Sequence, residues 1–172
     1  MLPISAKEPL IILASARRHG DTESLVKRLF SGKDHKLVNL LDHHISPYSY
    51  SGKYGAEDCF PSIADQLLQQ DRIILATPVY WYSMSGLLKT FFDRLTDLVT
   101  IDKPSGRRMA GRKVYVVAVG SDPEWPLGFE EPFKLTAAYF GMEYCGGYYC
   151  PTSDLTLQKL PKAASFVEQV YS

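Results

Sequence analysis

The segment from Arg72 to Arg94 reads RIILATPVYWYSMSGLLKTFFDR and decides the fold. It begins with a continuous apolar run, Ile73 to Ala76, which is short enough for a strand and lacks the alternation of a half-solvated one. Such a run is typical of a strand buried on both faces, as in a parallel sheet. Pro78 has no amide proton for a strand ladder, so we expect a loop to begin there. Apolar residues return at helical spacing from Leu87 to Leu95, which predicts a helix with Ser85 as its N-cap.

Three consecutive aromatic residues, Tyr80, Trp81 and Tyr82, lie in this predicted loop. Taken alone, they favour packing, either as a lid on the core or as a contact between subunits. Their position favours ligand binding, because open α/β sheets bind ligands outside the carboxyl ends of their strands. The small residues that follow, such as Ser83 and Gly86, would let backbone amides approach a planar ring closely.

The rest of the chain alternates predicted strands with predicted helices. We expect strands at 9–14, 36–41, 73–76, 114–119 and 144–149, and helices at 24–30, 63–68, 87–95, 133–140 and 163–171. Irregular or polar links are expected at 42–60 and 104–112. This alternation predicts an α/β fold with a doubly wound five-stranded parallel sheet, strand order 2-1-3-4-5 and helices on both faces. In this order the loops after Ala14 and Thr77 flank one crevice, with the loop after Val119 beside them.

Length and charge restrict the class of protein. The chain has 172 residues, which we expect to form one domain, residues 1–172. Acidic and basic residues number 19 each, so no overall field attracts nucleic acid or an anionic membrane. The apolar runs are too short to cross a bilayer, and residues 1–8 lack the apolar segment of a signal peptide. We therefore expect a soluble, cytoplasmic protein without nucleic-acid or membrane partners.

The cysteines and histidines give little indication of disulfide bonds or of a metal site. Cys59, Cys145 and Cys150 are too few and too scattered for a disulfide framework and suit a reducing compartment. The spacing of Cys145 and Cys150 leaves a metal clip open as an alternative, but unlinked thiols on or near a strand are expected first. His43 and His44 are expected in a solvated loop. We predict no metal site.

The predicted turn from Ser15 to Thr22 is a candidate phosphate site. It combines hydroxyls, two arginines and a glycine between the first strand and the first helix. Amides at a helix N-terminus, together with the helix dipole, favour a phosphate there, and Ser15, Arg17 and Thr22 would add side-chain contacts. Asp21 and Thr22 have a second interpretation, as the N-cap of the helix.

Other cofactor and catalytic motifs are absent from the sequence. The chain has neither the nucleotide-binding pattern G-x-x-x-x-G-K-[ST] nor a G-x-G-x-x-G at its first helix. It also has no cysteine in the first loop, which a low-molecular-weight tyrosine phosphatase would need, and no acidic group at the end of the third strand, which a response regulator would need.

The combined motifs resemble the NADPH-dependent FMN reductase family, which has a flavodoxin-like fold. The motifs are Ser15-x-Arg17 with Asp21-Thr22, Pro78-x-Tyr80, and Ser85-Gly86-x-Leu88-Lys89-x-x-x-Asp93. The resemblance implies that FMN phosphate is bound by Ser15, Arg17, Asp21 and Thr22. It implies that the isoalloxazine ring is held by Pro78, Val79, Tyr80, Trp81, Tyr82 and Ser83, with Gly120, Ser121 and Asp122 at its far edge.

The chain departs from the family pattern at two places. Trp81 and Tyr82 stand where the family often has Asn-Gly, and Ser85 stands where it often has proline. The segment 42–60 also resembles that of iron-sulfur flavoproteins, but a single cysteine, Cys59, cannot hold a cluster. The resemblance therefore implies FMN without an iron-sulfur centre.

The implied activity is hydride transfer from NADPH or NADH through FMN to a small acceptor, such as a quinone, a flavin, an azo or nitro compound, or a metal ion. The flavin carries the chemistry, so no catalytic side chain is expected. Lys89 and Asp93 are expected to form an exposed pair. Trp81, Tyr82 and Trp125 are expected on the substrate side.

The resemblance also implies a homodimer or homotetramer. The alternative function is that of a flavodoxin-like FMN electron carrier without NAD(P)H activity. The balanced charge of the chain argues against a carrier that docks basic partners.

Overall fold

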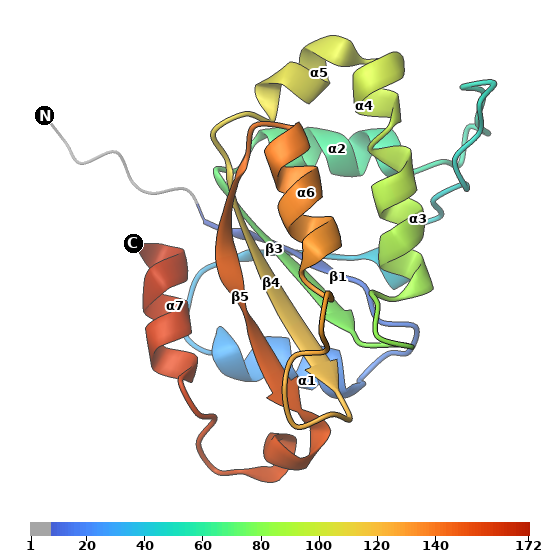
Figure 1. Ribbon diagram of the computed structural model, residues 1–172. Coiled ribbons are helices and arrows are strands. Elements are labelled where there is room, and N and C mark those ends of the chain that lie inside the picture. The colour runs from blue at the N-terminus through green and yellow to red at the C-terminus, as the bar shows by residue number, and fades with distance from the viewer. Residues whose placement is uncertain (1–7) are drawn as a thin grey trace, which may run out of the picture.

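A five-stranded parallel sheet forms the centre of the protein. The computed structural model describes residues 8–172, so the expectation about a signal segment lies almost entirely outside the described chain. The predicted strand order 2-1-3-4-5 is confirmed, and every pair of neighbouring strands is parallel (Figure 1). The strands are β1 (Leu10–Leu13), β2 (Lys36–Asn39), β3 (Arg72–Pro78), β4 (Lys113–Gly120) and β5 (Glu143–Pro151).

Helices cover both faces of this sheet. The longer helices are α1 (Asp21–Leu29), α2 (Phe60–Leu68), α3 (Gly86–Arg94), α6 (Glu131–Tyr139) and α7 (Ala163–Tyr171). Residues of α1 and α7 share one buried cluster, and residues of α2, α3 and α6 share the other. Figure 1 shows α3 and α6 on the near side of the sheet. The doubly wound α/β architecture is thus confirmed.

The continuous apolar runs of the strands follow from these two layers. Leu10 and Ile12 of β1 point into the cluster with α2, α3 and α6, whereas Ile11 and Leu13 point into the cluster with α1 and α7. All four side chains are at most 1% exposed. Because successive side chains of a strand point to opposite faces, a strand covered on both sides has no position for a polar residue.

Most element boundaries differ by a few residues from the sequence-based expectation, and two of the differences have a clear physical cause. Pro78 is the last residue of β3 instead of the first loop residue, because the ladder continues beyond it through the Val79 amide, 2.7 Å from the Val119 oxygen. The second strand ends at Asn39, whose side chain accepts a bond from the Leu41 amide (3.1 Å) and starts the 3₁₀ helix η1 (Leu40–Asp42).

The polar link predicted at 104–112 also contains regular structure. It includes most of α5 (Lys103–Arg108), which follows the short helix α4 (Asp97–Thr100). The Asp102 side chain caps α5 by accepting a bond from the Ser105 amide at 3.3 Å. A second 3₁₀ helix, η2 (Thr152–Thr156), follows β5.

A buried arginine fixes the irregular segment 43–59 to the body of the protein. Arg94, at the end of α3, is 1% exposed and donates two hydrogen bonds of 2.8 Å to the carboxylate of Asp58. It also donates to Asp97 (2.8 Å) and to the carbonyl of Ser46 (3.0 Å), and its guanidinium lies 3.4 Å from the centre of the Tyr54 ring. The segment projects beside α3 and α4 in Figure 1, and the contacts of Arg94 with Ser46, Tyr54 and Asp58 attach it to the body of the protein.

The same cluster sets the titration of Asp58. Burial raises the pKa of its carboxyl, but the hydrogen bonds from Arg94 and from the Ser46 amide outweigh burial and bring the pKa below its usual 3.8. A carboxyl whose folded pKa is lowered stabilises the protein above the unfolded pKa, and this contribution is lost as the pH falls through the folded pKa.

We predict that Asp58→Asn lowers the free energy of unfolding at pH 7 by about 1.5 to 3 kcal/mol, because buried Arg94 loses its paired hydrogen bonds to a carboxylate and keeps only Asp97 as an ionic partner. The variant should also lose part of the wild-type decline in stability below pH 4. Urea unfolding followed by circular dichroism at pH 7 and at several acidic pH values measures both effects. Asp93→Asn on the same helix is the control, because its pair with Lys89 is exposed and changes stability by about 0.5 kcal/mol or less.

Candidate functional site

The carboxyl ends of β1, β3 and β4 bring three loops together at one edge of the sheet. Gly120, at the end of β4, faces Val79 so closely that an added Cβ would lie 3.2 Å from the Val79 Cβ. It would also lie 2.6 Å from the Tyr149 hydroxyl. The strand order therefore places the loops after Ala14, Thr77 and Val119 as neighbours, as the sequence predicts.

Ser85 connects the first two of these loops. Its hydroxyl donates to the carbonyl oxygen of Ala14 at 2.6 Å and accepts a bond from the Leu88 amide at 3.2 Å. Its own amide donates to the Thr77 hydroxyl at 3.0 Å, and Ser85 is 1% exposed. The predicted N-cap role is confirmed. The bond to Ala14, 71 residues away, is one that the sequence gives no sign of.

The predicted phosphate loop offers unpaired donors. Ser15 and Thr22 are 5% and 1% exposed, yet within residues 8–172 neither side-chain hydroxyl makes a hydrogen bond. No fully buried hydroxyl lacks a partner among these residues, so both oxygens reach the surface of the loop. Gly20 is the N-cap of α1 and supplies no side-chain bond, which leaves the amides of the first turn without a cap.

The alternative that Asp21 or Thr22 caps α1 is therefore wrong. Asp21 pairs instead with Arg17 (3.1 Å), and Thr22 lies inside the first turn. Glu23 in the same turn accepts bonds from Lys27 (2.5 Å) and from the His19 amide (2.6 Å), and these bonds hold its pKa below the usual value. With its carboxylates paired, the loop suits a phosphate bound by amides, two hydroxyls and the exposed Arg17.

The aromatic loop is a tight hairpin. The amide of Tyr80 donates to the carbonyl of Ser83 (2.9 Å), and the amide of Ser83 donates back to Tyr80 (3.1 Å). The two residues between them, Trp81 and Tyr82, have φ angles of +48° and +63°. Two left-handed central residues define a type I′ turn, which normally contains Asn-Gly.

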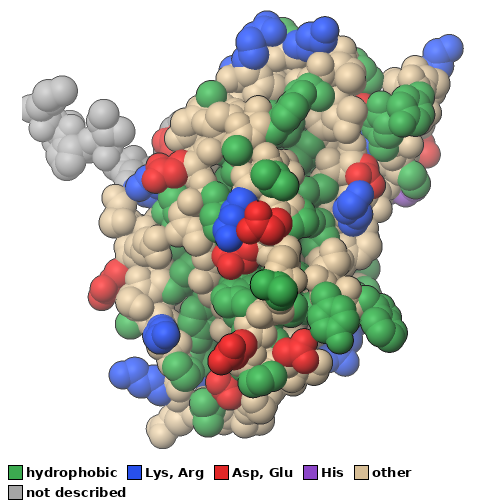
Figure 2. Space-filling model, in the orientation of Figure 1, with side chains coloured by type: hydrophobic (Ala, Val, Ile, Leu, Met, Phe, Trp, Pro, Cys, Tyr) green, Lys and Arg blue, Asp and Glu red, His purple; other side chains and the backbone are tan. Residues whose placement is uncertain are grey.

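The side chains of this hairpin point to solvent. Trp81 is 93% exposed, Tyr82 is 66% exposed and Tyr80 is 48% exposed. Figure 2 shows hydrophobic side chains standing out at the lower right corner, where Figure 1 places the loop after β3. The interpretation of the triplet as a lid on the core is therefore wrong for Trp81 and Tyr82.

The third loop is held against β5. The Tyr149 hydroxyl donates to the carbonyl oxygen of Asp122 at 2.7 Å, and burial raises the pKa of this tyrosine, so it remains a donor at neutral pH. Trp125 is half-buried, with its ring centre 5.2 Å from that of Tyr149 and 5.5 Å from that of Phe129. It covers Gly147, where a Cβ would lie 3.0 Å from the indole. Trp125 therefore packs against β5, and its place on the substrate side stays a prediction.

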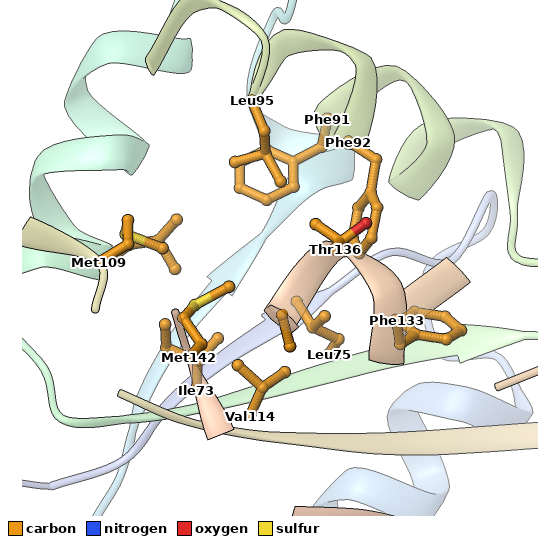
Figure 3. Close-up of a pocket in the computed structure, with 12 residues that line it drawn as sticks. Ile73, Leu75, Phe91, Phe92, Leu95, Met109, Val114, Phe133, Thr136 and Met142 are labelled. Atoms are coloured by element: carbon orange, nitrogen blue, oxygen red, sulfur yellow. The ribbon is translucent and has the colours of Figure 1, made fainter. Parts of the chain in front are cut away.

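An apolar cavity of about 30 Å³ lies elsewhere, inside the core (Figure 3). Side chains of α2, α3 and α6 meet those of β3 and β4 around it, and only Thr136 among its lining residues is polar. Binding pockets for cofactors measure about 300 to 1,000 Å³, so this void is a gap in packing.

Several secondary expectations can be compared with the structure. Lys89 and Asp93 form an exposed pair (2.6 Å), as predicted. The three cysteines are free thiols, and Cys145 and Cys150 lie on β5 as expected. Among residues 8–172, no group of three or more His, Cys, Asp or Glu side chains could hold a metal ion. Within the same residues, no helix has the length and hydrophobicity to span a membrane.

Comparisons with known proteins identify the family of this chain. The model of the NADPH-dependent FMN reductase family matches residues 9–150. YwqN of Bacillus subtilis (strain 168), whose name describes an NAD(P)H-dependent FMN-containing oxidoreductase, is 30% identical over 147 residues, which are 79% of this chain and 80% of YwqN.

Solved structures show the same architecture. The structure of the Trp repressor binding protein from Bacillus subtilis superposes with a TM-score of 0.74 at 26% identity, covering 96% of this chain and 99% of that one. An FMN-dependent NADH-azoreductase from Bacillus anthracis, solved with FMN, has a TM-score of 0.67 at 11% identity and covers 96% of this chain and 100% of that one, which shows the fold alone.

The fold and the family match define a flavodoxin-like protein that binds FMN. The chain belongs to the NADPH-dependent FMN reductase family. It is an FMN-dependent oxidoreductase that uses NAD(P)H as electron donor.

We predict that the double change Trp81→Asn and Tyr82→Gly raises the free energy of unfolding by about 1 kcal/mol. A non-glycine residue in the left-handed region costs about 1 to 2 kcal/mol, and Asn-Gly relieves much of this strain at the expense of some unfolded-state entropy. Urea unfolding measures the change. The control, Trp81→Ala with Tyr82→Ala, removes both rings but keeps both strained positions, and equal stabilisation of the two variants would contradict the explanation.

Proposed function

We propose that the enzyme transfers a hydride from NADPH or NADH through FMN bound at the three joined loops to a small-molecule acceptor. The observation that carries this proposal is the connection of the loops at the sheet edge, where Ser85 binds Ala14 and Val79 binds Val119. When bound there, FMN supplies two-electron redox chemistry. The residues around it bind and orient the reactants.

The loop after β1 supports the phosphate end of the proposal. Ser15 and Thr22 offer hydroxyls that are otherwise unpaired, and the first turn of α1 offers uncapped amides. Arg17 would add a positive charge. Asp21 would hold Arg17 in place by the ion pair that it already forms.

The loops after β3 and β4 support the ring end. Residues Pro78 to Ser83 would contact one edge of the isoalloxazine through the rigid hairpin backbone. Gly120, Ser121 and Asp122 would line its far edge. The close packing of Gly120 against Val79 leaves no space for a side chain, which favours an approach of the ring to backbone atoms.

We infer further that the enzyme works in the cytoplasm as a homodimer or homotetramer. Two features support this inference. The chain carries no net charge that would direct it to a membrane surface. Leu135 and Tyr139 of α6 are 67% and 72% exposed, and large exposed apolar side chains on one helix favour an interface between copies.

We predict that the purified protein reconstituted with FMN is yellow and loses its visible absorption when NADPH or NADH is added without oxygen. Anaerobic absorption spectroscopy measures this reduction. Addition of an electron acceptor should then oxidise the flavin and restore the yellow colour. A protein that binds FMN but is not bleached by either donor would act as an electron carrier and would contradict the proposed enzyme.

We predict that Arg17→Ala weakens FMN binding by roughly tenfold to a hundredfold, because a hydrogen bond to a charged group contributes about 1.5 to 3 kcal/mol. The fold should not change, since the Arg17 side chain is 68% exposed. Quenching of FMN fluorescence measures the affinity. Arg18→Ala is the matched control, because Arg18 is also exposed and pairs with Asp42 on η1. Equal affinities of wild type and Arg17→Ala would contradict the phosphate assignment.

A further inference from the structure

Strand β5 leaves one long edge of the sheet unpaired. The strand order ends at β5, so within residues 8–172 no strand lies on its outer side. The strand at the opposite edge, β2, has four residues, whereas β5 has nine. An edge strand presents a row of unpaired N–H and C=O groups, and short edge strands are one way in which proteins avoid pairing with other chains. Strand β5 lacks this protection.

The first half of β5 is protected in another way. The register with β4 shifts by one residue near Gly146, whose φ angle is +99°. Such a β-bulge twists an edge and interrupts pairing. The side-chain amide of Gln169 on α7 also donates to the carbonyl oxygen of Cys145 at 2.7 Å. From Gly147 to Pro151 the pairing with β4 is regular again, so this second half presents a regular edge to solvent.

A groove of about 660 Å³ follows this second half, and we call it the β5 groove. All five residues from Gly147 to Pro151 line it. On one face of the sheet Trp125 packs on Tyr149, with ring centres 5.2 Å apart. On the other face Phe166 of α7 packs on Tyr148, with ring centres 5.6 Å apart. Figure 1 shows α7 beside β5, with the connection through η2 at the lower end. The groove thus has an edge of backbone between two aromatic walls.

The β5 groove is distinct from the proposed FMN site. Of the described residues that line it, none is predicted to contact FMN, and Trp125 is shared with the predicted substrate side. Its charged lining residues are Glu124, Asp154 and Lys162. Within the part of the chain that the structure describes, none of these three forms an ion pair. Two carboxylates against one ammonium leave the groove with an excess of negative charge, which favours a ligand that carries basic groups.

We propose that the β5 groove binds an extended basic peptide segment of another protein, which adds to the sheet as a sixth strand. The free N–H and C=O groups of β5 would bond to the main chain of the peptide, and alternate side chains would lie beside Trp125 and beside Phe166. Aliphatic β-branched residues suit both a strand and an aromatic wall, and basic residues at the ends suit Glu124 and Asp154. This binding needs neither FMN nor electron transfer.

The probe is the rhodamine-labelled peptide Lys-Val-Thr-Val-Thr-Val-Lys, and fluorescence anisotropy with the FMN-loaded protein measures its binding. We expect saturable binding of one peptide per chain. N-methylation of two adjacent central residues removes N–H groups from both edges of the peptide. It should weaken binding at least roughly tenfold, because each lost hydrogen bond contributes about 0.5 to 1.5 kcal/mol. Absence of binding by the parent peptide, or equal binding by the methylated one, would overturn the proposal.

Two variants of α7 test the position of the peptide. Ser165 is exposed and lines the β5 groove, so Ser165→Trp should fill the groove and weaken peptide binding at least roughly tenfold. Ala164→Trp is the matched control, because Ala164 is the exposed neighbour and does not line the groove. It should change the affinity by less than about twofold. Equal affinities of the two variants would place the peptide elsewhere and overturn the proposal.

The charge of the groove and the state of assembly complete the test. A peptide with glutamate in place of both lysines should bind at least roughly threefold more weakly, and equal binding would contradict a basic ligand. Sedimentation velocity without peptide should show the same oligomeric state for the wild type and Ser165→Trp. Dissociation of this variant would make the β5 groove an interface between copies and overturn the proposal. Failure of NADPH to bleach the wild type would contradict the proposed function and leave these binding results unaffected.

Discussion

The buried hydroxyl of Ser85 is the contact on which the geometry of the site depends. It donates to the carbonyl of Ala14 and accepts from the Leu88 amide, while the Ser85 amide binds Thr77. Each of these polar groups lies where water cannot replace a lost partner, so the loop after β1 and the start of α3 are held in one relative position. The two halves of the proposed FMN site are thereby fixed before any cofactor arrives.

A second buried cluster acts at the other end of α3. Arg94 ties the segment 43–59 to α3 and α4 through Asp58, Asp97 and Ser46. With Ser85 before its first turn and Arg94 in its last, α3 is fixed at both ends. The aromatic hairpin leads directly into this helix, which explains how an exposed loop with two strained residues keeps a defined shape.

The pattern of the sequence was enough to predict much of this arrangement. Apolar runs without alternation identified the strands, and their alternation with helical segments predicted the order 2-1-3-4-5. The serine at position 85 directly precedes an apolar helical repeat, which predicts an N-cap. The burial of Arg94 is not among the sequence-based expectations, although Arg94 lies three residues after the buried Phe91 and therefore on the same face of α3. A charged residue at such a position indicates a buried ion pair.

By itself the sequence determined which segments form strands, which form helices and which loops meet, because these depend on local periodicity and on the few topologies open to a parallel sheet. Only the tertiary structure decided how the loops are fastened. Ala14, the partner of Ser85, is 71 residues away, and Asp58, one of the partners of Arg94, is 36 residues away, sequence separations at which no local pattern carries information. The same holds for the aromatic loop. Its residue types are compatible with packing or binding. Two hydrogen bonds between Tyr80 and Ser83 close the hairpin, and in this conformation the side chains of Trp81 and Tyr82 point to solvent.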